Sequence, residues 1–221
     1  MAQLVWDKIS ERTYETGVEK GVLYIQGEDG SYGNGEAWNG LINVTETPSG
    51  AEPSPFFANN KKYLNILSLE ELSTSITAYD SPESFDACDG MGSIAPGVVM
   101  GQQIRKSFGL CYKTLYGNDT KATEYGYKIH LVYGCMASPS ERAYNTANDS
   151  PEPIEFSWEC TTTPIEGPTG TKPSSIVIID STTADPTKLK ALEDILYGTA
   201  DTEPRLPLPT EVSTLLGEAA G

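Results

Sequence analysis

Apolar and polar residues alternate along several segments of this chain, which is the pattern of β-strands that bury one face. Residues 154–161 show it most clearly, since their apolar side chains all share one parity: Ile154, Phe156, Trp158 and Cys160. Glutamate, serine and threonine occupy the other parity. We therefore predict a strand with one face in the core and one acidic face in solvent. Residues 104–116 and 127–133 alternate in the same way.

The connection between these last two segments contains the turn-forming residues Gly117, Asn118 and Asp119, so the segments are predicted to form a hairpin. Residues 175–179 are apolar on both parities, as expected for a strand that is covered on both sides. Short runs rich in β-branched or aromatic residues predict further strands, at residues 22–25, 63–69 and 75–79.

A helical period occurs near the C-terminal end. Asp185 is a suitable N-cap, Pro186 suits the first helical position, and Gly198 suits the end of the helix. The apolar residues between them recur at helical spacing: Leu189, Leu192, Ile195 and Leu196. Ser138 and Glu141 have the spacing of a capping box and predict a shorter helical turn.

Two segments rich in glycine or proline, residues 27–40 and 47–60, are predicted to be long loops. Residues 199–221 contain several prolines and are predicted to form a C-terminal arm whose leucines need cover from their own domain or from another subunit. Long ordered loops often carry function, here contact with neighbours. The apolar side chains of these segments are our candidates for contacts between subunits: Trp38, Phe56, Phe57, Leu206, Leu208, Leu215 and Leu216.

Strands, one flanking helix and extended ends describe a mainly β protein, namely an antiparallel β-sandwich or small barrel. With 221 residues and 38% apolar content, the chain is expected to form a single domain over residues 1–221. Its predicted parts are an N-terminal arm with the first strand, the long loops, the β-sandwich with its helix, and the C-terminal arm: residues 1–25, 27–60, 61–198 and 199–221.

The charge balance narrows the possible partners. Fifteen lysines and arginines against 31 aspartates and glutamates give a net charge of −16. This balance disfavours a surface that neutralises phosphates, so we expect no specific binding to nucleic acid or to an anionic membrane. The first 25 residues are rich in charged side chains and contain no apolar signal core. We therefore expect a soluble protein that is made in the cytoplasm.

The sequence offers no clear place for catalysis, metal or cofactor. The four cysteines form no CxxC pair, and without an export signal we expect free thiols that pack as small hydrophobic groups. The single histidine, His130, lies in mid-strand and is interpreted as a surface or interface residue. Pairs of carboxylates arise by chance in so acidic a chain, and no phosphate-binding glycine motif stands between a strand and a helix. We therefore predict a protein that is not an enzyme.

Eight segments, taken together and in order, resemble the major tail tube proteins of siphophages, particularly of phages that infect Gram-positive bacteria. The match spans nearly the whole chain, and no single segment is diagnostic. The segments are residues 13–24 (TYETGVEKGVLY), 37–52 (AWNGLINVTETPSGAE), 63–72 (YLNILSLEEL), 101–114 (GQQIRKSFGLCYKT), 126–134 (GYKIHLVYG), 138–144 (SPSERAY), 148–159 (NDSPEPIEFSWE) and 191–209, which holds ALEDILYGT and EPRLPLP.

This resemblance implies a β-sandwich flanked by a helix that forms hexameric rings, which stack into the tube through which the genome passes. The arms would bridge subunits and successive rings. The implied partners are further copies of the chain and the tape measure, tail-tip and tail-terminator proteins, and the implied location is the virion tail, after synthesis in the host cytoplasm. DNA would pass through the lumen without specific binding.

The resemblance also gives the negative charge a role. Six copies would bring on the order of −100 charges to each ring, and a lumen of that sign would repel phosphates. The candidates for lining the lumen are Glu155 and Glu159, with Glu70 and Glu71 behind them. The alternative for each glutamate is an ordinary position in outer solvent.

A second hypothesis is a β-sandwich binding module of the same virion that recognises a host surface or a carbohydrate. In that case Trp6, Trp38 and the tyrosines would stack on sugar rings. The helix near the C-terminus and the long arms favour assembly over a compact binding module.

Overall fold

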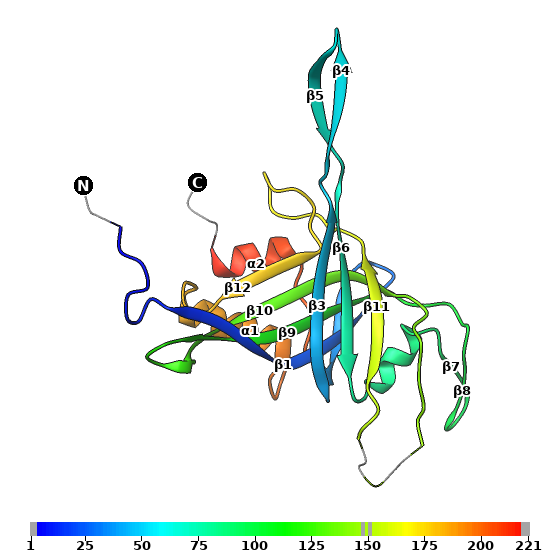
Figure 1. Cartoon of the computed structure of the whole chain (residues 1–221). Helices are drawn as coiled ribbons and strands as arrows, with labels where there is room; N and C mark the ends of the chain where they lie inside the picture. The colour runs from blue at the N-terminus through cyan, green and yellow to red at the C-terminus, as the bar shows by residue number, and fades with distance from the viewer. Residues whose placement is uncertain (1–3, 147–148, 150–151, 218–221) are drawn as a thin grey trace.

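Eight strands form one large antiparallel sheet, which confirms that the protein is mainly β (Figure 1). The computed structural model describes residues 4–146, 149 and 152–217. In the sheet the order is β2-β1-β9-β10-β11-β6-β3, and β12 also pairs with β10. The bounds are β1 (Thr13–Gln26), β2 (Tyr32–Trp38), β3 (Leu41–Gly50), β6 (Glu70–Ala78), β9 (Phe108–Asn118), β10 (Ala122–Ala137), β11 (Phe156–Thr162) and β12 (Ile176–Asp180).

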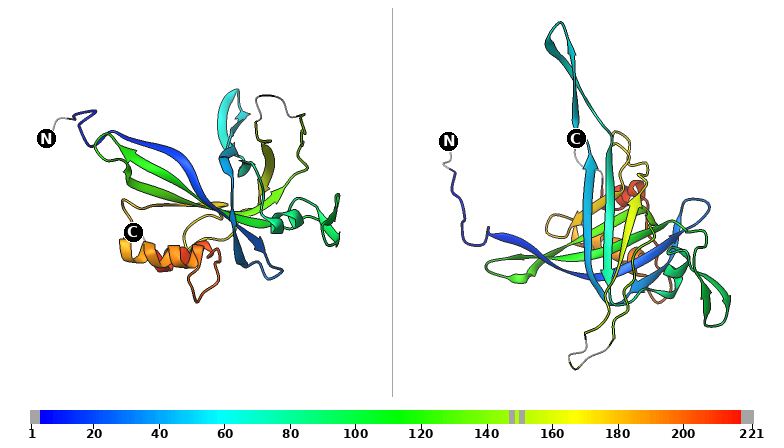
Figure 2. Two further views of the ribbon diagram at one scale, coloured as in Figure 1. Left: turned by 90° about the horizontal axis from the view of Figure 1, so that it is seen from below. Right: turned by 45° about the vertical axis from the view of Figure 1, so that its right-hand side comes forward.

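The strand β10 belongs to two layers. Its middle part pairs with β12 at Lys128–Val132, and its last residues pair with β11 at Cys135–Ala137. Between these parts Gly134 has a φ of 62°, and a side chain there would meet the carbonyl oxygen of Thr163 at 2.3 Å. A residue without a Cβ therefore lets β10 change direction. The sheet divides into a body layer, β2-β1-β9-β10-β12, and a front layer, β11-β6-β3, whose strands cross over it (Figures 1 and 2).

The first hydrophobic core lies between the two layers. Its centre is an aromatic cluster in which the ring of Phe85 lies 4.7 Å from that of Trp38 and 5.3 Å from that of Trp158, between centroids. Phe85 comes from the short 3₁₀ helix η1 (Glu83–Ala87). Tilted and edge-on pairs of this kind add to the stabilisation from buried area. Trp38 is only 3% exposed, so the prediction that it reaches a neighbouring subunit from a loop was wrong.

The second core lies between the body layer and two helices, α1 (Pro186–Tyr197) and α2 (Pro209–Leu216). The predicted helix is confirmed as α1, since the Asp185 carboxylate accepts hydrogen bonds from the amides of Thr187 and Lys188 at its start. The leucines that it buries against the sheet are Leu189, Leu192 and Leu196. The four cysteines are free and buried in the two cores, as predicted.

The C-terminal segment packs on its own domain. Leu206 is 2% exposed within the second core, and the hydroxyl of Tyr133 donates a hydrogen bond of 2.9 Å to the carbonyl of Pro207. Leu215 and Leu216 of α2 pack against the same core. The prediction of an extended arm was wrong here, because Pro209 occupies the first turn of a helix, where proline is tolerated. Residues 218–221 of the predicted arm lie outside the described part of the chain.

Residues 27–60 form strands rather than the predicted long loops. They contain β2, β3 and the first strand of a separate hairpin, β4 (Pro53–Ala58) with β5 (Lys61–Leu67). Glycine in β2 serves close packing, since a Cβ on Gly35 would meet the ring of Tyr24 at 2.5 Å. The prolines lie in the edge strand β3 and in the exposed β4, where a missing N–H is tolerated.

Two smaller predictions also differ from the structure. The strand predicted from residue 104 begins at Phe108, and Ile104 before it is exposed. No helical turn forms at Ser138, where the backbone N–H donates to the carbonyl of Glu159 and so continues the pairing of β10 with β11. The segment after it is held by Arg142, which pairs with the buried carboxylate of Asp89.

Candidate interaction surfaces

The hairpin of β4 and β5, which we call the arm (residues 53–67), projects far from the two layers (Figures 1 and 2). Every one of its residues is exposed, including large apolar side chains: Phe57 is 70% and Tyr63 75% exposed. An isolated two-stranded hairpin is marginally stable in water, and exposed apolar patches of this kind mark sites of contact. The apolar side chains of the arm are therefore typical of a surface that contacts another molecule.

The charges of the arm differ from those of the rest of the chain. No aspartate or glutamate occurs between Glu52 and Glu70, and the only charged residues of the arm are Lys61 and Lys62. The whole chain has a net charge of −16. A neutral to basic projection can approach an acidic body without the repulsion that two like-charged surfaces would meet.

A second apolar hairpin projects from another side of the molecule, formed by β7 (Gly92–Ala95) and β8 (Val98–Met100) (Figure 1). Its exposed apolar side chains are Ile94, Val98, Val99 and Met100. No strand was predicted for these residues. The signal was present, however, because residues 90–104 contain no charged residue at all.

The outer face of the front layer is polar. Its hydroxyl groups lie close together, with the Oγ of Ser157 3.3 Å from that of Ser75 and 3.4 Å from the Oγ1 of Thr77. Glu159 pairs with Ser75 across β11 and β6, and Thr45 of β3 pairs with Ser75 from the other side. On this face of the described strands, alternation places serine, threonine, asparagine and glutamate but neither lysine nor arginine.

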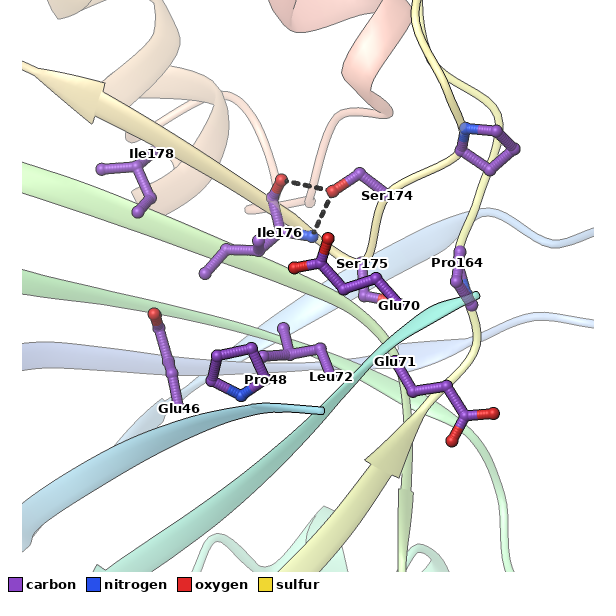
Figure 3. Close-up of a pocket in the computed structure, with 11 residues that line it drawn as sticks. Glu46, Pro48, Glu70, Glu71, Leu72, Pro164, Ser174, Ser175, Ile176 and Ile178 are labelled. Atoms are coloured by element: carbon purple, nitrogen blue, oxygen red, sulfur yellow. Dashed lines mark hydrogen bonds between the residues drawn. The ribbon is translucent and has the colours of Figure 1, made fainter. Parts of the chain in front are cut away.

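Three of the four glutamates predicted for a lumen share this face. Glu71, Glu155 and Glu159 are exposed and have its parity. Glu70 does not share it, because neighbouring residues of a strand point to opposite sides. Its side chain lies beside Ile176 of β12, while that of Glu71 points away from it (Figure 3).

Glu70 lies at a cavity of about 330 Å³ where the front layer passes over the start of β12 (Figure 3). The cavity walls combine carboxylates, including Glu46, with apolar side chains such as Leu72 and Ile178. Among the described residues no group of three or more histidines, cysteines or acidic residues is placed to hold a metal ion. The described lining of the cavity includes the hydroxyls of Ser174 and Ser175 but contains no histidine, cysteine or lysine.

The thiols are also poor nucleophiles. Burial raises the pKa of Cys111 to about 12 and that of Cys160 to about 12, so both groups are protonated at neutral pH. A reactive cysteine requires the thiolate and access from solvent. Neither condition is met at these two positions.

The seven side chains predicted to contact other subunits separate into two groups. Phe56, Phe57 and Leu208 are exposed. Trp38 and Leu206 are buried in their own domain, which corrects the prediction for these two, whereas Leu215 and Leu216 are only partly covered by it and stay candidates. The remaining exposed candidates lie mainly on the arm.

Comparison with known proteins gives no further assignment: no protein-family model and no curated protein matches this chain. None of the described helices combines the length and the apolar character that crossing a membrane would require.

Proposed function

We propose that this chain is a structural subunit that assembles with copies of itself into stacked rings, as the tube of a bacteriophage tail. The observation that carries the proposal is the arm: an exposed, apolar hairpin that contains no acidic residue, on a chain of net charge −16. Exposing these apolar side chains to water is unfavourable, and a partner that covers them removes this unfavourable contribution to the free energy. An acidic copy of the same chain is a partner of suitable charge.

The geometry favours contacts of the head-to-tail kind. The arm and the β7–β8 hairpin point in different directions from the body (Figure 1). Contacts between unlike surfaces close into rings or continue along an axis, whereas a twofold contact would stop at a dimer. Two separate projections supply what is needed for one contact within a ring and another between rings.

The front layer suits the wall of a channel. Its outer face carries hydroxyl groups and the carboxylates of Glu71, Glu155 and Glu159. A surface of this kind repels phosphates and offers DNA no cation to bind. The edge strand β3 has a backbone partner, β6, on one side only within the described residues, so a neighbouring copy can extend the sheet.

Negative-stain electron microscopy and light scattering at high protein concentration test the proposal. We expect rings or striated tubes from the native chain and loss of them in Tyr63→Ser combined with Phe57→Ser. Tyr144→Ser is the matched control, since Tyr144 is 70% exposed but lies outside the arm. Native protein that stays monomeric even with tail-tip and tape-measure proteins added would contradict the proposal.

The alternative of a carbohydrate-binding module has less support. Of the two tryptophans expected to stack on sugars, Trp38 is enclosed in the core and only Trp6 is exposed. A glycan screen with the monomeric protein would test this function if assembly fails.

A further inference from the structure

His130 was interpreted from the sequence as a surface or interface residue, but in the single chain it is only 7% exposed, and it contacts Glu46 of the front layer. Three other strands place polar side chains around it. Glu15 comes from β1 and Glu46 from β3, while Tyr112 and Thr114 come from β9. The chain has no other histidine. A buried imidazole between two carboxylates demands a physical explanation.

Both nitrogens of the ring have oxygen partners. Nδ1 lies 3.1 Å from Oε1 of Glu46. Nε2 lies 3.1 Å from Oγ1 of Thr114 and 3.4 Å from Oε1 of Glu15. The ring stacks on Tyr112 with 4.6 Å between centroids and 10° between planes. A face-on aromatic ring favours a cation above it.

The hydrogen atoms of this cluster can be assigned from its donors and acceptors. The hydroxyl of Thr114 donates to Oε1 of Glu15 at 2.5 Å, and Nζ of Lys128 donates to Oε2 of the same carboxylate at 2.6 Å. Tyr112 donates to Glu46. The single hydroxyl hydrogen of Thr114 is used in the bond to Glu15, so the oxygen of Thr114 can only accept a hydrogen bond from Nε2 of His130.

Both carboxyl groups are ionised and therefore only accept hydrogen bonds. Burial alone would raise the pKa of each, but the hydrogen bonds and charges of the cluster outweigh it and hold the pKa of Glu46 and that of Glu15 below the usual value. For Glu46 the donors are His130 and Tyr112, and for Glu15 they are Lys128 and Thr114. A glutamate is ordinarily ionised at neutral pH, so Glu46 cannot donate, and Nδ1 of His130 must also carry a hydrogen.

We propose that His130 is an imidazolium latch, a cation with both ring nitrogens protonated that ties β3 of the front layer to the body layer. Two carboxylates then face two cations, His130 and Lys128, and the cluster is neutral. Loss of the second proton would leave one uncompensated negative charge and a repulsion between Glu15 and Glu46. From β12, Asp180 is a further acidic group near Lys128, and Ile178 pairs with His130 itself.

The latch acts on the base of the arm. Glu46 lies in β3, the strand that ends at Gly50 and leads into the arm at Pro53. Within the described residues β3 has a backbone partner on one side only, and the contacts of Glu46 with His130 and Tyr112 join this strand to the body layer. Release of the latch would loosen the end of β3 and with it the direction of the arm.

The expected pH dependence has a definite sign. A free histidine loses its proton near pH 6.5, at about the value for an unfolded chain. The latch requires both hydrogens of His130, so the stabilisation that it gives is present at low pH and is lost as the pH rises. The latch is a property of the single subunit, so it does not depend on the proposed assembly.

Nitrogen-15 NMR of the labelled full chain gives a direct test, because all histidine signals come from His130. At about pH 7.5, where a free histidine is mostly neutral, we expect both ring nitrogens to show the shifts of imidazolium. In Glu46→Gln the change of these chemical shifts from imidazolium to neutral imidazole should occur at a lower pH. A neutral tautomer in the native chain at that pH would overturn the proposal.

The second test measures unfolding in denaturant between about pH 6 and pH 9. The unfolding constant of the native chain should rise more over this range than that of His130→Gln, because only the native chain loses the latch as the pH rises. Parallel profiles would overturn the latch. Should His130→Gln fail to fold, amide exchange in the native chain replaces it: protection in β3, relative to β9, should fall as the pH rises, and constant relative protection would count against the proposal.

Discussion

The hydroxyl of Tyr24 donates a hydrogen bond of 2.6 Å to the carbonyl oxygen of Leu196, which joins β1 to the last turn of α1. The two residues are 172 positions apart, and both are fully buried. The last carbonyls of a helix have no partner within the helix, and here one of them finds it in a strand of the sheet. The contact therefore fixes the end of α1 on the body layer.

Removal of this hydroxyl is predicted to destabilise the fold. Tyr24→Phe leaves the Leu196 carbonyl buried without a partner, which costs about 1–3 kcal/mol in the free energy of unfolding. Urea denaturation, monitored by circular dichroism, measures this change in the free energy of unfolding. Tyr63→Phe on the exposed arm is the control and should change stability by less than about 0.5 kcal/mol. Equal effects of the two substitutions would show that the buried hydrogen bond contributes nothing.

Two glycines of β2 allow a test of whether this strand requires its close approach to Tyr24. Gly35→Ala places a methyl group about where the Tyr24 ring lies, at 2.5 Å, and should cost on the order of 1–3 kcal/mol through overpacking. Gly33→Ala, in the same strand, meets no atom within 4 Å and should be neutral or slightly stabilising. Thermal unfolding of both variants decides the matter. A neutral Gly35→Ala would mean that β2 does not need its close approach to Tyr24.

The buried thiols are predicted to be unreactive in the folded chain. Burial raises the pKa of Cys88 to about 12, as it does at Cys111 and Cys160. A thiol reagent at neutral pH should therefore label the native protein orders of magnitude more slowly than the same protein in denaturant. All four cysteines should react once the chain unfolds. Rapid labelling of native protein would contradict the burial described here.

The polar face of the front layer can be tested in assembled particles. Glu155→Lys combined with Glu159→Lys reverses two charges on the face proposed to line the channel. Attraction to phosphates should then slow genome ejection. Glu203→Lys with Asp201→Lys, exposed positions on a different segment, provides a charge-matched control. Ejection at the native rate in the first variant would place the front layer elsewhere than the lumen.

The alternating segments could be predicted from the sequence because each one buries a single face. β11 and the hairpin of β9 and β10 follow from the parity of their apolar residues, and α1 follows from Asp185, Pro186 and the leucine spacing. Residues 27–60 could not be predicted in this way. Glycine and proline in this segment indicate turns when only the local sequence is considered. Gly35, however, is required by a contact with a distant residue, because it makes room for the ring of Tyr24.

The candidate surfaces were only partly predictable for a related reason. Phe56 and Phe57 were recognised, but an apolar side chain such as Leu206 carries no local sign of whether its own domain or a neighbour covers it. Charge was a better guide than hydrophobicity, because both projecting hairpins lack acidic residues in an acidic chain. The environment of His130 depends on side chains from three other strands, which no local pattern reveals.

The position of β10 between the two cores has a mechanical consequence. Because one continuous strand contributes Ile129 and Leu131 to one core and Val132 and Cys135 to the other, neither core can melt without withdrawing β10 from its neighbour. The two cores should therefore unfold in a single cooperative transition. A load applied to the arm would pass through β3, β6 and β11 into the same strand, so that tension at one end of the subunit is borne by its whole interior.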